Sequence, residues 1–218
     1  MMTQHRALNL LSDEQLFIAF IKGDFTSFEA LYARHKGGLY RYLLRQLKNE
    51  ALAEDIYQDV WSKVLSAAST YTADAKFSTF LYTLARNKVI DHSRHSKMKS
   101  KIEVGSADQI MRTRNENDAE PELRGKQPIE EQALDSDPAS PERNLLIKSQ
   151  QVAIEHCLEK LPEHQLECFL LKEEGGFTAN EIAEIIATGF EATKSRLRNA
   201  YQSLRKCLSI KLEGERYV

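Results

Sequence analysis

The stretch that says most about the fold of this chain is residues 177–200, FTANEIAEIIATGFEATKSRLRNA. Thr178 is followed three residues later by Glu181, a capping-box pair that predicts the start of a short helix. Gly189 stands where the chain has to turn, and a basic second helix follows it. This pattern predicts a helix-turn-helix, a motif that places its second helix in the major groove of DNA. A helical hairpin with a solvated basic face is the alternative.

Charge is unevenly distributed along the chain, which favours a nucleic-acid partner although the formal net charge is only −2. Residues 85–101 and residues 190–211 each carry a net charge of +5, whereas residues 102–143 carry −6. In the second basic segment, side chains suited to phosphates and base edges are Lys194, Ser195, Arg196, Arg198 and Asn199.

The composition is that of a globular protein, with 42% hydrophobic and 28% charged residues among 218. Neither a long apolar run nor the pattern of a signal peptide is found, so we expect a cytoplasmic protein. Cys157, Cys168 and Cys207 offer no even-numbered disulfide framework, and we expect buried free thiols. His164 and Cys168 stand four residues apart, but the spacing matches no closed zinc module, so we expect no metal.

Apolar residues recur at helical spacing from Asp13 to about His95, and no strand pattern competes. The strongest signals predict helices over residues 51–68 and from about 78 to 94. Residues 98–143 hold four of the five prolines and few large apolar side chains, a composition that predicts a flexible linker.

Helical periodicity returns from Asn144 and is interrupted at Pro162. The sequence therefore predicts an all-α fold of two small helical domains joined by a flexible acidic linker. The first domain would span residues 12–97, the linker 98–143, and the second domain, with the helix-turn-helix, 144–212.

Five segments outside the linker stand in a characteristic order. They are FIKGDFTSFEALYARHKGGLYRYL, AEDIYQDVWSKVL, KFSTFLYTLARNKVIDHSR, LPEHQLECFLLKEEGGFTANEIAEI and TKSRLRNA. Each alone is weakly specific. Their order and spacing, together with the distribution of charge, resemble the extracytoplasmic-function (ECF) group of the bacterial sigma-70 family of RNA polymerase sigma factors.

The resemblance implies one domain that reads and melts the minus-ten promoter element and another that reads the minus-thirty-five element. It implies binding and not catalysis, with no cofactor, metal, small-molecule substrate or catalytic residue. The implied partners are promoter DNA, the clamp helices and flap of core RNA polymerase, and an anti-sigma factor that can hold such proteins at the inner membrane.

The resemblance also assigns site residues in the first domain. Asp55, Gln58 and Asp59 match positions that face the clamp helices, and a solvated helix face is the alternative. The following loop and helix match the segment that melts and holds the minus-ten element, where side chains can hold unstacked bases and phosphates. The candidates there are Asp74, Ala75, Lys76, Phe77, Arg86, Asn87, Lys88, Asp91, His92 and Arg94.

The chain departs from the family pattern at the turn, because Ala187 stands where glycine is common. We therefore expect the turn to shift, with Gly189 taking a positive φ. Two rival functions remain. A stand-alone helix-turn-helix regulator would need a sensory or dimerising first domain, and a helical adaptor between proteins would leave both basic segments unexplained.

Overall fold

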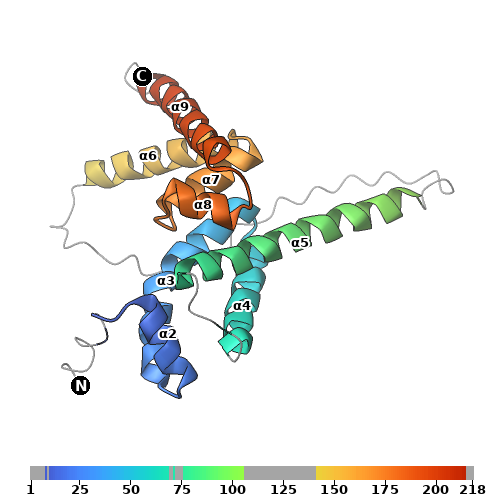
Figure 1. The fold of residues 1–218 in the computed structure, drawn as a ribbon. Helices are drawn as coiled ribbons and strands as arrows, with labels where there is room; N and C mark the ends of the chain where they lie inside the picture. Colours follow the sequence, from blue (N-terminus) through green and yellow to red (C-terminus); the bar gives the residue numbers. More distant parts are fainter. Residues whose placement is uncertain (1–7, 9, 69–70, 72–75, 106–140, 215–218) are drawn as a thin grey trace.

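The computed structural model describes residues 8, 10–68, 71, 76–105 and 141–214, and the regular structure within them is all α-helical, as predicted (Figure 1). The N-terminal bundle consists of α2 (Asp13–Ile21), α3 (Phe25–Leu47), α4 (Glu50–Ala67) and α5 (Phe77–Gly105). The C-terminal bundle consists of α6 (Pro141–Glu159), α7 (Glu163–Glu173), α8 (Ala179–Ile185) and α9 (Phe190–Gly214). None of the helices within these ranges has the length and apolarity to span a membrane.

Two helices extend beyond their predicted bounds. Helix α5 continues past Arg94 to Gly105, into the segment that we assigned to the linker. Gly105 is the first glycine or proline after Phe77, so no earlier residue breaks the helix. Helix α6 begins at Pro141, three residues before the predicted start, because proline is well tolerated in the first helical turn. The remaining linker residues, 106–140, lie outside the described part of the chain.

The N-terminal bundle closes around an aromatic core. The rings of Phe17 and Phe77 are 4.9 Å apart, and those of Phe28 and Trp61 are 5.8 Å apart. In α4 the predicted repeat of apolar residues faces inward, with Ile56, Val60 and Val64 buried. Each large side chain that is fully removed from water contributes roughly 1.5–3 kcal/mol to folding.

Aliphatic side chains fill the interior of the C-terminal bundle, where α7 and α8 pack against α9. Its buried residues include Leu166, Leu170, Ile182, Leu197 and Ala200. Figure 1 shows this bundle at one end of the molecule, seated on α3 and on the first half of α5, while the second half of α5 projects away. Buried residues of both bundles belong to one continuous hydrophobic cluster.

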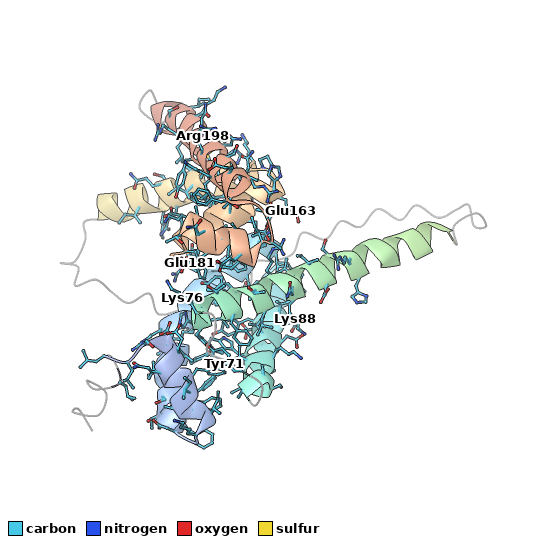
Figure 2. All side chains as sticks on the ribbon, viewed as in Figure 1. Tyr71, Lys76, Lys88, Glu163, Glu181 and Arg198 are labelled. Atoms are coloured by element: carbon cyan, nitrogen blue, oxygen red, sulfur yellow. A yellow bond between two sulfur atoms is a disulfide. The ribbon has the colours of Figure 1, made fainter. Side chains whose placement is uncertain are left out.

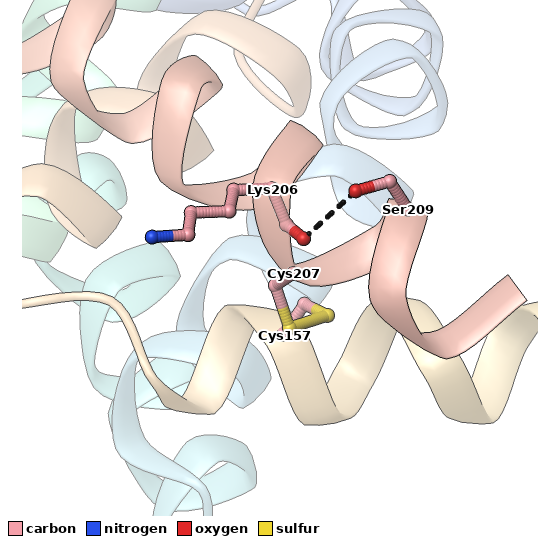
Figure 3. The surroundings of a disulfide bond; sticks show 4 residues. All are labelled: Cys157, Lys206, Cys207 and Ser209. Carbon is pink, nitrogen blue, oxygen red and sulfur yellow. Dashed lines mark hydrogen bonds between the residues drawn. A yellow bond between two sulfur atoms is a disulfide. The ribbon is translucent and has the colours of Figure 1, made fainter. Parts of the chain in front are cut away.

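A disulfide joins Cys157 of α6 to Cys207 of α9, with 5.8 Å between the Cα atoms (Figure 3). The prediction of free thiols is wrong for these two cysteines and confirmed for Cys168, which is buried and unpaired. Packing of α6 along α9 brings together residues that are 50 positions apart, and sequence spacing carries no information about that contact. In the chain-entropy account, closing a loop of this length stabilises the fold by about 4 kcal/mol.

The helix-turn-helix forms as predicted at its start and differs at its turn. Thr178 and Glu181 make the reciprocal hydrogen bonds of a capping box, with Thr178 N donating to Glu181 Oε2 at 2.8 Å. The positive φ lies at Ala187, at 50°, and not at Gly189, so the predicted shift of the turn is wrong. Thr188 N donates to the carbonyl of Ala183 at 2.9 Å, a bond that holds the turn at Ala187.

The strained residue in this turn leads to a prediction about stability. Ala187→Gly should raise the free energy of unfolding by about 1 kcal/mol, because glycine adopts a positive φ without the Cβ clash. The matched control is Ala192→Gly in the first turn of α9, which should lower it by about 0.5–1 kcal/mol. Urea denaturation of both variants gives the two values. If Ala187→Gly were as destabilising as the control, the left-handed turn would be contradicted.

Candidate nucleic-acid interface

Helix α9 divides into a buried face and an accessible one. The side chains packed against the rest of the C-terminal bundle are Thr193, Leu197, Ala200 and Leu204. Lys194, Arg198 and Asn199 are exposed and Ser195 is half-buried. The Lys194 ammonium lies 5.9 Å from the centroid of the Phe190 ring, a cation–π contact at the start of the helix. Four of the five candidate residues in α9 therefore share one accessible surface.

Arg196, the fifth candidate, lies on another side of the helix from Lys194 and Arg198. It lies two positions from both Lys194 and Arg198, which is roughly 200° around the helix. Arg196 is half-buried and contacts the Cys168 thiol of α7. Burial raises the pKa of this thiol, while the Arg196 guanidinium acts in the opposite direction. Arg196 thus lies beside α7 and keeps part of its surface exposed.

Two basic residues of α5, Arg86 and Lys88, form ion pairs with neighbouring helices. Arg86 Nε donates to Glu167 Oε1 of α7 at 2.8 Å, and Lys88 Nζ donates to Asp59 Oδ2 of α4 at 2.7 Å. The exposed candidates of this helix are Asn87, Asp91, His92 and Arg94. Lys88 on α5 and Arg198 on α9 lie well apart in Figure 2, so the two basic surfaces are separate.

The loop that we assigned to strand melting is described only at its end. Asp74 and Ala75 lie outside the described residues. Lys76 is exposed, and its ammonium donates to Glu181 Oε1 of α8 at 2.7 Å. Phe77 has no exposed surface, and its backbone N–H donates to Glu14 Oε1 at 2.9 Å. This burial removes the Phe77 ring from the groups that can stack on a base in this conformation.

The polar ridge of α4 faces solvent. Asp55, Gln58 and Asp59 are all exposed, on the side of the helix opposite its buried apolar residues. Gln58 Nε2 donates to Glu54 Oε1 at 3.1 Å, one turn earlier in the same helix. Asp59 is the acceptor for Lys88, so this ridge adjoins the basic surface of α5.

Sequence reasoning missed a set of contacts between the two bundles. Glu174 at the end of α7 accepts from Arg41 Nε at 2.6 Å and also from Arg45, both in α3. Gly38, within the segment of helical periodicity, was the available signal, because a Cβ there would lie 2.7 Å from the backbone carbonyl oxygen of Glu174. Among the residues that the structure describes, no group of three metal-ligating side chains is found.

Each of the two bundles matches a different known protein-family model. Residues 31–98 match the family described as Sigma-70 region 2, and residues 151–204 match Sigma-70, region 4. Together the matches cover more than half of the chain. The chain belongs to the sigma-70 family.

Curated relatives indicate the group within this family. The ECF RNA polymerase sigma factor SigK of Mycolicibacterium vanbaalenii is 25% identical over 190 residues, which cover 86% of this chain and 84% of that protein. SigK of Mycobacterium tuberculosis H37Rv is 25% identical over 205 residues, covering 92% and 96%. The chain is thus an ECF sigma factor, a class of transcription initiation factors, and the stand-alone regulator is not supported.

Solved structures share the fold of this sigma factor. The sigma factor RpoE of Bartonella quintana, in complex with the anti-sigma factor NepR, has a TM-score of 0.58 at 16% identity, covering 84% of this chain and 97% of that one. CnrH in complex with the cytosolic domain of CnrY also has a TM-score of 0.58, at 18% identity, covering 91% and 97%.

The capping-box glutamate leads to a prediction about pH. Hydrogen bonds from Lys76 and Thr178 lower the pKa of Glu181 to about 2 from 4.5. Its stabilising contribution is therefore complete above pH 4.5 and is lost as the pH falls towards 2. Glu181→Gln keeps the capping geometry but removes the ionisable group. In urea titrations at pH values from about 6 down to about 3, the free energy of unfolding of the wild type should fall more steeply than that of Glu181→Gln. Parallel curves would contradict the assignment.

Proposed function

We propose that this ECF sigma factor carries three contact surfaces for transcription initiation. The accessible face of α9 reads the minus-thirty-five element, α5 holds the minus-ten element, and the polar ridge of α4 binds core RNA polymerase. This division is supported by the presence of two basic surfaces on different helices, α5 and α9. The polar ridge of α4 lies beside the surface of α5.

The upstream contact is proposed for the first turns of α9. Lys194, Ser195, Arg198 and Asn199 lie together there, and the N-terminal part of a recognition helix is the part that enters a major groove. Lysine and arginine can bind guanine edges or phosphates, and asparagine can bind adenine. Arg196 is left out of this surface because it contacts Cys168.

The downstream contact is proposed for α5. Residues 85–101 carry a net charge of +5, and Asn87, His92 and Arg94 are exposed along the helix. A basic surface of this kind can hold the phosphates of a displaced strand. Lys76 would contribute to strand melting at the start of the same helix, with Asp74 and Ala75 of the preceding loop.

The polymerase contact is proposed for Asp55, Gln58 and Asp59. An amphipathic helix that buries its apolar side in its own bundle leaves its polar side free for a partner with complementary charge. The clamp helices of the largest subunit are the partner that we propose for this ridge, with the flap contacting the C-terminal bundle. The likeness to sigma factors in complex with NepR and CnrY supports an anti-sigma factor as a further partner. Such a partner would hold the chain at the cytoplasmic side of the inner membrane.

Promoter reading by α9 can be tested with holoenzyme and DNA sequences selected from a random pool. Lys194→Ala and Arg198→Ala should each cost about 1–3 kcal/mol of binding where a base contact is lost, and should relax preference at one position. The control is Lys206→Ala, which removes the same charge further along α9. Competition binding against the selected sequence measures both quantities. Unchanged affinity and preference in the Lys194 and Arg198 variants would reject this surface.

Polymerase binding by α4 can be tested by titration of labelled chain with purified core enzyme. Asp55→Lys should weaken binding about tenfold, because it places a like charge against a basic partner surface. Glu50→Lys reverses an equally exposed charge in the first turn of α4 and should leave binding nearly unchanged. Equal affinities for wild type and Asp55→Lys would mean that the ridge is only a solvated helix face.

A further inference from the structure

An exposed aromatic ring lies at the start of the helix proposed to read the minus-thirty-five element. Phe190 is the first residue of α9 and is 42% exposed. It does not belong to the hydrophobic cluster that the described residues of the two bundles form. Single exposed apolar residues are common on protein surfaces, so what matters for this ring is its position.

Phe190 begins a row of residues spaced four apart along α9. Lys194 and Arg198 follow it, and residues at this spacing lie one above the other on the surface of a helix (Figure 2 labels Arg198). The Lys194 ammonium lies 5.9 Å from the centroid of the Phe190 ring. Both basic residues belong to the surface proposed above to read the minus-thirty-five element, so the ring lies directly beside that surface.

The first turn of α9 is open to a partner. Gly189 is exposed, and a Cβ built on it would have no heavy atom within 4 Å apart from its chain neighbours. Glu191 and Ala192, the two residues after Phe190, are exposed as well. Because the N-terminal part of a recognition helix is the part that enters a major groove, the ring can follow it there.

A phenyl ring in the major groove can distinguish one base from the other three. Thymine presents a C5 methyl group there, and the side chain of phenylalanine can make an apolar contact with it. The ring has neither a hydrogen-bond donor nor a charge, so it is unsuited to the polar edges of the other bases and to phosphates.

We propose that Phe190 is a specificity-determining residue, which selects thymine in the minus-thirty-five element by contact with the C5 methyl group. The cation–π contact with Lys194 holds the ring in place. The two residues are separated by about 6 Å along the helix axis and successive base pairs by about 3.4 Å, so the thymine lies within about two base pairs of the Lys194 contact. This inference rests on the proposed reading of the minus-thirty-five element by α9.

Replacement of thymine by uracil tests the contact, because it removes the methyl group and keeps the base-pairing groups. The probe is the promoter that wild-type holoenzyme selects from a random pool, with each thymine of the minus-thirty-five element replaced by uracil in turn. Competition binding measures the affinity of wild-type and Phe190→Ala holoenzymes for each promoter. The matched control is Ile210→Ala, which removes an exposed apolar side chain from the later part of α9.

At one thymine, we expect loss of the methyl group to weaken binding by wild-type holoenzyme about fourfold, the effect of exposing one buried methyl group. Phe190→Ala should bind the thymine and uracil forms of that position equally, and Ile210→Ala should behave like wild type. If loss of the methyl group costs wild type and Phe190→Ala the same at every thymine, or if the selected element contains no thymine, the proposal is rejected.

Stability and polymerase binding test other roles of the ring. Because Phe190 is exposed, urea denaturation should give Phe190→Ala a free energy of unfolding close to that of wild type. If this variant is much less stable, Phe190→Leu replaces it, and its methyl effect should be smaller than that of wild type. Phe190→Ala should bind core polymerase with wild-type affinity. Weaker binding, with an unchanged methyl effect, would mean that the ring contacts polymerase and would overturn the proposal.

The variants of Lys194 and Arg198 separate this inference from the function on which it rests. If these variants lose affinity or sequence preference while Phe190→Ala keeps the full methyl effect, only the role of Phe190 is rejected. If neither Lys194→Ala nor Arg198→Ala changes affinity or preference, the proposed minus-thirty-five surface itself fails.

Discussion

The arrangement of the two bundles depends on the carboxylate of Glu174. This group is almost completely removed from water, and its free energy is tolerable only because Arg41 and Arg45 both donate to it. The same residue lends its backbone carbonyl to Tyr82 and lies against Gly38, where a side chain would not fit. Charge, hydrogen bonding and close packing therefore meet at one residue, and the positions of α7 and α8 over α5 follow from it.

A consequence of this arrangement is that basic residues serve two kinds of partner. Guanidinium and ammonium groups bind carboxylates and phosphates through the same donors, so a surface built for DNA is also a surface for glutamate. Arg86 and Lys76 are paired within the chain, while Lys194 and Arg198 of α9 are not covered. The two proposed DNA-binding surfaces thus differ in accessibility, although the segments 85–101 and 190–211 carry the same net charge.

Much of the fold could be predicted because its signals are local. The capping box at Thr178 and the four-residue repeat of α4 depend on residues within one or two turns of each other, and the structure confirms both. The sequence predicts the positive φ at Gly189 because glycine adopts it at the lower intrinsic cost. The hydrogen bond from Thr188 N to the carbonyl of Ala183 instead closes the turn at Ala187. Within the site, the exposure of Asp55 and Arg198 was predictable from helix periodicity, whereas the packing of Arg196 against Cys168 was not.

By itself the sequence determined the helices, the two basic segments and the family, since each depends on residue type and spacing along the chain. Only the tertiary structure decided which of the charged residues are free. The disulfide between Cys157 and Cys207 and the pairing of Arg86 with Glu167 join residues that are 50 and 81 positions apart. Such contacts depend on how helices pack in three dimensions, and a periodicity of 3.6 residues specifies a buried face without specifying what covers it.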